Sequence, residues 1–515
     1  MHATTNSRAA RSSDLGQAFL PVLVMAVISA AALILVHQRG WTLYYGDAEA
    51  HLNIARRLLD SRTPGPDQLG TVWLPLPHLL MFPLAQVDSL WQNGLAGALP
   101  AAFCFVVAGA FLFAAVRRVF GSAAAVATTA LFGLNPNLLY LQSTPMTEAM
   151  FFASLMALLY YSLKLNAVGA GLAALAGTLI RYEGWFLLPF TAIYFLLTAK
   201  HKRLQHAALF TVISALGPIL WLAHNRWYFS DALAFYWGPY SPKAIQGSAP
   251  YPGYGDWGQA WLYFRTAVQL CAGWPLVWMG LAGAVTAAYR RVFWPVLLLA
   301  LPGAFYLWSM HSSGGSPIFV PTLWPKSYYN TRYGLALFPL AVFAAGALVT
   351  LVPRRLRPAA AALIVIAGIS PWLLRPHPDR WVTWKEAEVN STARRNWTRQ
   401  AAEFLKTEFH QRAGVFTSFG DITGIYRQAT IPLRETLTGD NAPLWDAAVA
   451  RPDLFLWEQW AVVMGGDSVQ TAINRSRRRG RNYALVKTII VKGAPVIEIY
   501  RRDENSLHQS ARRQE

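Results

Sequence analysis

The stretch "FLPVLVMAVISAAALILVHQRGWTLYYGDAEAH", residues 19–51, joins a long uncharged run directly to an acidic segment. The apolar run, over about 17–37, has the roughly 20 residues that a helix needs to cross a bilayer. Asp47, Glu49 and His51 follow it closely, in a chain where charge is scarce. The stretch therefore predicts a membrane-spanning helix with a polar segment at its end.

The composition of the whole chain indicates an integral membrane protein. Of its 515 residues 54% are hydrophobic and 14% charged, and the mean hydropathy is +0.28, which is too apolar for an ordinary soluble protein. The net charge of +19 does not indicate nucleic-acid binding, because many of the basic residues flank apolar runs instead of sharing a soluble face. Both cysteines lie in apolar runs, so no disulfide framework is expected.

Eleven apolar runs are long enough, or nearly so, to cross a membrane as helices. They lie at about 17–37, 95–116, 120–134, 146–164, 167–181, 184–199, 206–224, 273–288, 292–310, 334–352 and 358–374. With the amino terminus inside, the cytoplasmic loops are all short and basic, as the positive-inside rule requires. The other side then receives the external loops 38–94, 225–272 and 311–333. This topology predicts a multi-pass protein of the inner (plasma) membrane with a cytoplasmic amino terminus.

The composition becomes that of a soluble protein from residue 375 onward. We therefore divide the chain into a transmembrane domain, 1–374, and an external α/β domain, 375–515. Strands are expected at "AGVFTSFGD" (413–421), "YALVKTIIV" (483–491) and "PVIEIYRR" (495–502), the last two as a hairpin, and helices at 394–411 and 442–474. The basic run 475–481 is expected to meet anionic lipid or solvent, and no nucleic acid.

The acidic segment after the first span is expected to form a helix lying in the membrane interface. The apolar residues that recur at helical spacing are Leu52, Ala55, Leu58 and Leu59. The charged residues Arg56, Arg57 and Asp60 are expected to face elsewhere, as in a helix that lies in the interface. Asp47 would begin this helix, where the helix dipole favours a carboxylate. The alternative is that Asp47 only caps the helix.

Other polar groups collect on the same predicted side of the membrane. Glu148 enters the fourth span, Arg181 and Glu183 occupy the turn after the fifth, and Lys326, Tyr329, Arg332 and Tyr333 precede the tenth. Taken singly, these clusters are also explained by a helix cap, a surface ion pair and an aromatic belt. Together they suit glycosyl transfer from a lipid phosphate, which needs a carboxylate base and cations for the departing phosphate. Asp47 fits the first role, and Arg332, Lys326 and Arg181 fit the second.

At these residues the chain resembles the GT-C glycosyltransferases that use polyprenyl-phosphate sugars, and most closely the bacterial protein O-mannosyltransferase and aminoarabinose-transferase branch. The resemblance covers about residues 15–375 and follows the order "GDAEAHLNIARR", "WLPLPHLLMFPL", "TEAMFF", "RYEGW" and "TRYGLALFPL". It implies transfer of a sugar, with inversion, to a protein, lipid or glycan hydroxyl in the cell envelope. The branch usually carries adjacent Asp-Glu where this chain has Asp47-Ala48-Glu49.

The candidate catalytic residues are therefore Asp47 as general base, with Glu49 and Glu148 after it. The candidate substrate-binding residues are Arg181, Glu183, Lys326, Tyr329, Arg332, Tyr333 and His51. No cofactor is certain; Mg²⁺ or Mn²⁺ is one alternative, since Asp47, Glu49, His51 and Glu148 offer oxygen and nitrogen ligands. Two other functions stay open: a flippase or transporter of lipid-linked glycans, and a non-catalytic scaffold for envelope enzymes.

Overall fold

The chain folds into two compact units, each built from separate stretches of sequence. The computed structural model describes residues 18–418, 420–477 and 482–502. Unit 1 comprises residues 1–41, 71–77 and 98–386, and unit 2 comprises residues 42–70, 78–97 and 387–515. Unit 2 thus combines most of the first external loop with the carboxyl-terminal region, whereas the sequence predicts one division at residue 374. The difference arises because residues of that loop pack on residues more than 300 positions away.

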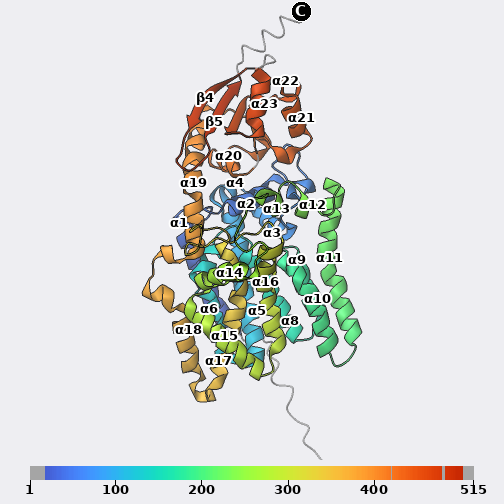
Figure 1. Ribbon diagram of the computed structural model, residues 1–515, viewed down its shortest axis with the longest axis vertical. Helices are drawn as coiled ribbons and strands as arrows, with labels where there is room; N and C mark the ends of the chain where they lie inside the picture. The colour runs from blue at the N-terminus through green and yellow to red at the C-terminus, as the bar shows by residue number, and fades with distance from the viewer. Residues whose placement is uncertain (1–17, 419, 478–481, 503–515) are drawn as a thin grey trace, which may run out of the picture. The chain divides into compact units, whose positions relative to one another are not determined.

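Unit 1 is helical throughout its core (Figure 1). Its helices are α1 (Phe19–Gln38), α5 (Leu95–Phe120), α6 (Ser122–Gly133), α7 (Pro136–Gln142), α8 (Glu148–Leu163), α9 (Ala167–Thr178), α10 (Glu183–Thr198), α11 (Arg203–Phe229), α12 (Ala234–Trp237), α13 (Pro242–Gln246), α14 (Trp257–Ala272), α15 (Trp274–Tyr289), α16 (Phe293–Ser312), the 3-10 segment η3 (Thr331–Leu337), α17 (Phe338–Leu348) and α18 (Arg357–Leu374). Helix α19 (Val382–Glu408) begins in unit 1 and continues into unit 2. All eleven predicted apolar runs fall on these helices.

Six helices among the described residues are long and apolar enough to cross a membrane, which makes this a multi-pass membrane protein. The number rises to seven if α14 and α15, bent by 107° at a short break, form one span. Four further predicted runs form α6, α8, α9 and α10, which have only 12 to 16 residues. The count of eleven spans therefore stays a prediction.

Small residues let the helices of unit 1 approach one another closely. Gly283 on α15 lies so near the backbone of α17 that an added Cβ would stand 1.9 Å from the Ala344 carbonyl oxygen. Helices in lipid gain no hydrophobic free energy by associating, so they depend on close van der Waals packing, which glycine permits at such crossings. At Asn135 the chain turns into α7, because the side chain accepts hydrogen bonds from the backbone N–H groups of Asn137 and Leu138.

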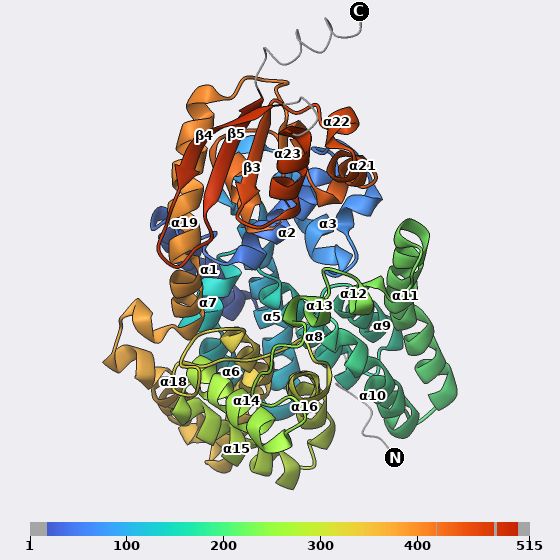
Figure 2. The ribbon, with the colours of Figure 1, turned by 45° about the horizontal axis from the view of Figure 1, so that its top comes forward.

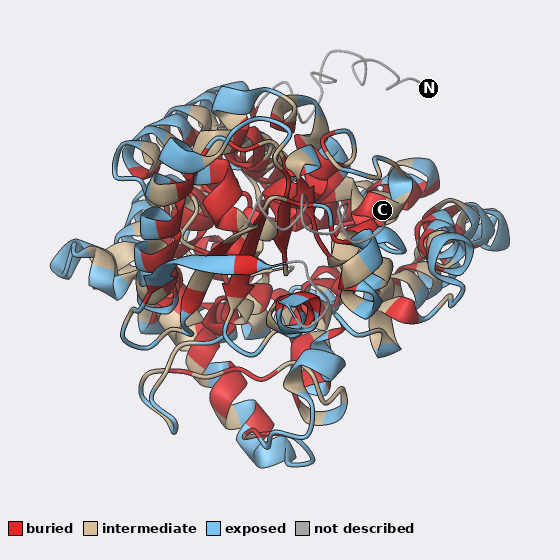
Figure 3. Cartoon of the chain, turned by 90° about the horizontal axis from the view of Figure 1, so that it is seen from above, coloured by how far each residue is buried: buried red, intermediate tan, exposed pale blue. Residues whose placement is uncertain are grey.

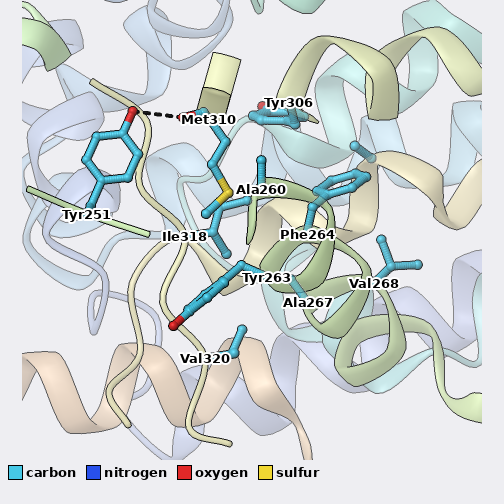
Figure 4. Close-up of a cluster of buried hydrophobic side chains, with 11 residues drawn as sticks. Tyr251, Ala260, Tyr263, Phe264, Ala267, Val268, Tyr306, Met310, Ile318 and Val320 are labelled. Atoms are coloured by element: carbon cyan, nitrogen blue, oxygen red, sulfur yellow. Dashed lines mark hydrogen bonds between the residues drawn. The ribbon is translucent and has the colours of Figure 1, made fainter. Parts of the chain in front are cut away.

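A buried cluster lies where α14 and α16 meet the segment that precedes η3 (Figure 4). Phe264 and Met310 are almost completely buried in it, and the Tyr251 hydroxyl donates to the Met310 carbonyl oxygen at 3.0 Å. Tyr306 belongs to the same cluster. Its hydroxyl leaves the apolar core for the charged groups described below, so this packing fixes one side of the candidate site.

Unit 2 contains a five-stranded sheet with strand order β2-β1-β3-β5-β4 (Figure 2). The strands are β1 (Val415–Thr417), β2 (Thr436–Leu437), β3 (Trp460–Met464), β4 (Tyr483–Ile489) and β5 (Ile497–Arg502), and the helices of the unit are α2 (Gly46–Arg57), α3 (Pro75–Ala85, which begins in unit 1), α4 (Asp88–Asn93), α20 (Gly424–Gln428), α21 (Leu444–Ala450), α22 (Pro452–Phe455) and α23 (Ser468–Arg477). Strand β1 is parallel to β2 and β3, and β5 is antiparallel to β3 and β4. The predicted β4–β5 hairpin is confirmed.

The single helix predicted over 442–474 is wrong. That region contains α21, α22, the strand β3 and most of α23. The run "WAVVM" at 460–464 forms the central strand, and four of its five residues are buried. By contrast β4 is an edge strand with five exposed residues in its middle, pale blue in Figure 3. Part of the basic run 475–481 lies outside the described residues.

Candidate functional site

Asp47 stands in the first turn of α2, in unit 2. The helix begins at Gly46 after the extended residue Tyr45, whose side chain makes no capping hydrogen bond. Asp47 is half-buried, and the positive end of the helix dipole favours its carboxylate. The predicted placement of Asp47 at the start of a helix is confirmed.

Glu49, two residues further on, is buried and held by two arginines. Its Oε2 accepts from Arg394 Nη1 at 2.7 Å and its Oε1 from Arg427 Nε at 2.8 Å. Burial by itself would raise the pKa of Glu49, but Arg427 and Arg394 outweigh it and lower the pKa. Gly424 packs on the same carboxylate, and an added Cβ there would stand 2.7 Å from Oε1. Glu49 therefore anchors α2 to α19 and α20.

The remaining charges of α2 are buried as well. Arg56 pairs with Asp60 at 2.7 Å and with Asp88 at 2.6 Å, while Arg57 pairs with Asp440. The prediction that Arg56, Arg57 and Asp60 face away from the packed side of an interfacial helix is therefore wrong. Sequence periodicity failed here because each of these charges has a partner that keeps it satisfied in the interior.

His51 lies beside a second histidine. Its Nδ1 is 2.9 Å from His78 Nε2, and both side chains are buried. Burial, followed by the nearby His51 and Arg57, holds the pKa of His78 well below its ordinary value. His78 is therefore neutral at neutral pH, and one of the two facing ring nitrogens donates to the other.

In unit 1, Arg181 lies in the turn between α9 and α10 and is the centre of a charged cluster. Its Nε donates to Glu183 Oε1 at 2.6 Å and its Nη1 to Glu148 Oε1 at 3.2 Å. Its Nη2 donates to the Tyr306 hydroxyl, which in turn donates to Glu183 Oε1 at 2.9 Å. Glu183 and Tyr306 thereby fix the orientation of the guanidinium.

Arg332 brings a second guanidinium to the same carboxylate. Its Nε is 3.4 Å from Glu148 Oε1, and its Nη1 donates to Glu386 Oε1 at 3.1 Å. The Tyr333 ring lies against this group, with its centroid 5.2 Å from the Arg332 guanidinium carbon and 5.8 Å from that of Arg181. The structure thus brings together Glu148, Arg181, Glu183, Arg332 and Tyr333, all of which the sequence proposed.

Glu148 has one carboxylate oxygen without a hydrogen-bond partner among the described residues. It is the first residue of α8 and is buried, and its Oε2 accepts no hydrogen bond from the described residues. A buried carboxylate oxygen without a partner is costly and uncommon in native proteins. The cluster is therefore an incomplete polar site, of the kind that a substrate or water completes.

The solved structures with a similar fold include ArnT from Cupriavidus metallidurans. Bound to undecaprenyl phosphate, that protein matches with a TM-score of 0.55 at 14% identity, over 91% of this chain and 97% of the ArnT chain. In the apo state it matches with a TM-score of 0.52 at 15% identity and the same coverage. The predicted GT-C fold is confirmed. No family model and no curated protein sequence matches the chain.

The remaining predicted residues are not members of the charged cluster. Lys326 is exposed, and its side chain forms no ion pair with the described residues. Tyr329 is 44% exposed, and its backbone pairs with that of Phe319. Asp47, Glu49 and His51 belong to unit 2, whereas the arginine cluster belongs to unit 1.

Glu386 is a residue of the cluster that sequence reasoning missed. It is almost fully buried on α19 and accepts hydrogen bonds from both the backbone N–H and the guanidinium of Arg332. Burial raises the pKa of Glu386, and Arg332 opposes that rise. The only signal in the sequence was a carboxylate shortly after the last predicted span.

Among the described residues, no three His, Cys, Asp or Glu side chains are placed so that they could hold one metal ion. The carboxylate of Glu49 already accepts from two arginines. The buried Glu148 offers one carboxylate oxygen that accepts no hydrogen bond from the described residues. A site for Mg²⁺ or Mn²⁺ would therefore need oxygen atoms from the substrate phosphate.

Proposed function

We propose that this chain is a membrane glycosyltransferase that moves a sugar from a polyprenyl-phosphate donor to an acceptor hydroxyl on the extracytoplasmic side, with inversion. The observation that carries the proposal is the Arg181–Glu148–Arg332 cluster, in which two guanidiniums converge on one carboxylate oxygen. The fold adds support, because ArnT shares it and has been solved bound to undecaprenyl phosphate.

The two arginines suit the donor phosphate because each is held by a second carboxylate. The contacts that anchor them, 2.6 Å from Arg181 to Glu183 and 3.1 Å from Arg332 to Glu386, are shorter than their contacts with Glu148, 3.2 Å and 3.4 Å. A phosphate oxygen then replaces the Glu148 carboxylate as the acceptor of both guanidiniums. Glu183 and Glu386 meanwhile hold the two arginines in place. Charge that develops on the departing phosphate meets oriented cations that need no reorganisation.

Asp47 is proposed as the general base, and Glu49 as a residue that positions it. A base needs a carboxylate oxygen that can take a proton from the acceptor hydroxyl. Both oxygens of Glu49 accept from arginines. Asp47 is half-buried in the first turn of the same helix, where the helix dipole favours its ionised carboxylate. Glu148 is the second candidate, since its Oε2 has no partner.

The donor site is tested by titrating the purified protein in detergent with undecaprenyl phosphate. Arg332→Gln should weaken binding by at least 30-fold, because a bound phosphate loses a charge-assisted hydrogen bond, a loss of about 2 kcal/mol or more. Lys326→Gln is the matched control, with the same loss of charge on an exposed stem, and should weaken binding less than 3-fold. Equal effects of the two variants would contradict the assignment of the phosphate to this cluster.

A flippase or other transporter is the alternative, and detergent separates the two functions. Transport has no meaning without a sealed bilayer, whereas sugar transfer from lipid donor to acceptor continues in micelles. The described span interiors support the enzyme, since transporters place ionisable residues near the membrane midplane and these helices are nearly free of them.

A further inference from the structure

A groove of about 770 Å³ runs between α6 and α18 in unit 1, and none of the residues that line it belongs to the proposed site. The two helices pack against each other and lie side by side in Figures 1 and 2. The groove is lined by Phe120, Gly121, Ser122, Ala123, Val126, Ala127, Arg354, Arg357, Pro358, Ala361, Ala362, Val365 and Ile366. It has an apolar length and one cationic end.

The apolar length of the groove faces outward. Val126 on α6 is 49% exposed and Ile366 on α18 is 57% exposed. Both helices correspond to predicted spans, and α18 is among the six helices long and apolar enough to cross a membrane. Hydrocarbon chains, rather than water, suit such walls.

The cationic end is formed by Arg354 and Arg357, where α18 begins. A cation at a helix N-terminus opposes the helix dipole, which favours an anion there. Ser122, the first residue of α6, lines the same groove, and no side chain caps the start of either helix. Two helix starts and two guanidiniums therefore favour negative charge at this place.

The chain supplies no carboxylate from the segments that build the groove. No Asp or Glu occurs between Asp88 and Glu148, which covers α6, or between Asp256 and Asp379, which covers α18. Among the described residues, neither Arg354 nor Arg357 forms an ion pair. Within the described part of the chain, the Arg357 Nε donates one long hydrogen bond, 3.4 Å, to the Val352 carbonyl oxygen.

We propose that the groove binds an anionic phospholipid, with its phosphate at Arg354 and Arg357 and an acyl chain along Val126, Val365 and Ile366. A free phosphate would leave the apolar length unfilled, and a zwitterionic lipid would bring a second cation to two arginines. An anionic diacyl lipid satisfies both ends. The basic loop 353–357 lies on the predicted cytoplasmic side, where basic groups meet anionic headgroups. This inference does not rest on the proposed enzyme activity.

The test is native mass spectrometry of the purified full-length protein in detergent, titrated separately with palmitoyl-oleoyl phosphatidylglycerol and phosphatidylcholine. Each of Arg354→Gln and Arg357→Gln should weaken binding of phosphatidylglycerol by about 5-fold, and the double variant by about 30-fold, because each arginine contributes about that factor at an anionic surface. Binding of phosphatidylcholine should change less than 2-fold. Arg355→Gln is the matched control, since Arg355 is exposed on the same loop but does not line the groove.

A second variant tests the apolar length independently of charge. Ala362→Phe places a ring in the groove and should reduce binding of both lipids at least 5-fold, whereas Ala359→Phe, on the same helix but outside the groove, should not. The proposal is overturned if Arg355→Gln weakens binding as much as the groove variants, or if wild-type protein binds the two lipids equally. It is also overturned if inorganic phosphate at millimolar concentration displaces phosphatidylglycerol, which would identify a small-anion site.

Discussion

Replacing Glu49 by Gln distinguishes a structural role of this carboxylate from a catalytic one. The variant keeps the shape of the side chain but leaves Arg394 and Arg427 buried without a counter-charge, 2.7 Å and 2.8 Å from an amide. Removing one partner of a buried ion pair costs about 3–5 kcal/mol. Since two guanidiniums lose their partner, we expect the upper part of that range for the free energy of unfolding.

Pulse proteolysis of the purified protein in detergent measures this loss at pH 7. The pairing lowers the pKa of Glu49, so its stabilising effect is complete above the ordinary carboxyl pKa of about 4.5 and is lost as the pH falls through the lower folded-state value. The gap between parent and variant should therefore narrow in acid. Glu403→Gln, an exposed change on α19, is the control and should alter stability by less than about 0.5 kcal/mol.

The kinetic result decides the role. Any loss of turnover in Glu49→Gln should come from a displaced α2, so the pH at which the rate rises with deprotonation of the base should stay where it is in the parent. The reasoning is refuted if Glu49→Gln is as stable as the parent while its turnover falls 10²–10⁴-fold, the reach of a general base.

Three further predictions address the other groups. Because the pKa of His78 lies well below its ordinary value of 6.5, the unfolded protein binds a proton below pH 6.5 that the folded protein does not bind. The free energy of unfolding should therefore fall by up to about 1.4 kcal/mol per pH unit below pH 6.5. His78→Phe, measured by pulse proteolysis at pH 5 and 7.5, should flatten this pH dependence, and an unchanged dependence would assign it to other groups. Arg332→Ala should lower kcat/KM for the lipid donor by about 30-fold or more and Lys326→Ala far less, in a steady-state transfer assay; near-zero effects of both would return this loop to an aromatic-belt role. Gln400→Cys, exposed on α19, in a chain without the two native cysteines, should react with an impermeant maleimide once only the outer layer of the cell is permeabilised; labelling that requires lysis of the inner membrane would reverse the predicted topology.

Sequence reasoning succeeded where one physical signal dominates over many residues. Long uncharged runs predicted the helices of unit 1, because the bilayer allows few other structures. Clusters of charge beside the spans predicted Glu148, Arg181 and Arg332, because charge is scarce in this chain and therefore informative.

It failed where the partner of a residue is distant in sequence. Arg394 and Arg427 lie 345 and 378 positions from Glu49, and no local pattern connects them. The same holds for Arg57, whose partner Asp440 is also distant in sequence. Without that partner the local pattern predicted that Arg57 faces away from the packed side of the helix. Strand β3 was missed because a five-residue apolar run also fits a helix, and only its pairing with β1 and β5 distinguishes the two.

The central claim is that Asp47 is the base of a sugar transfer from a lipid phosphate, and turnover by Asp47→Asn tests it most directly. Asn caps a helix as well as Asp does, so expression and resistance to unfolding should survive, while transfer of labelled sugar from a polyprenyl-phosphate donor in detergent falls about 10²–10⁴-fold. Transfer by Asp47→Asn at nearly the parent rate would contradict the account and direct the search for the base to Glu148.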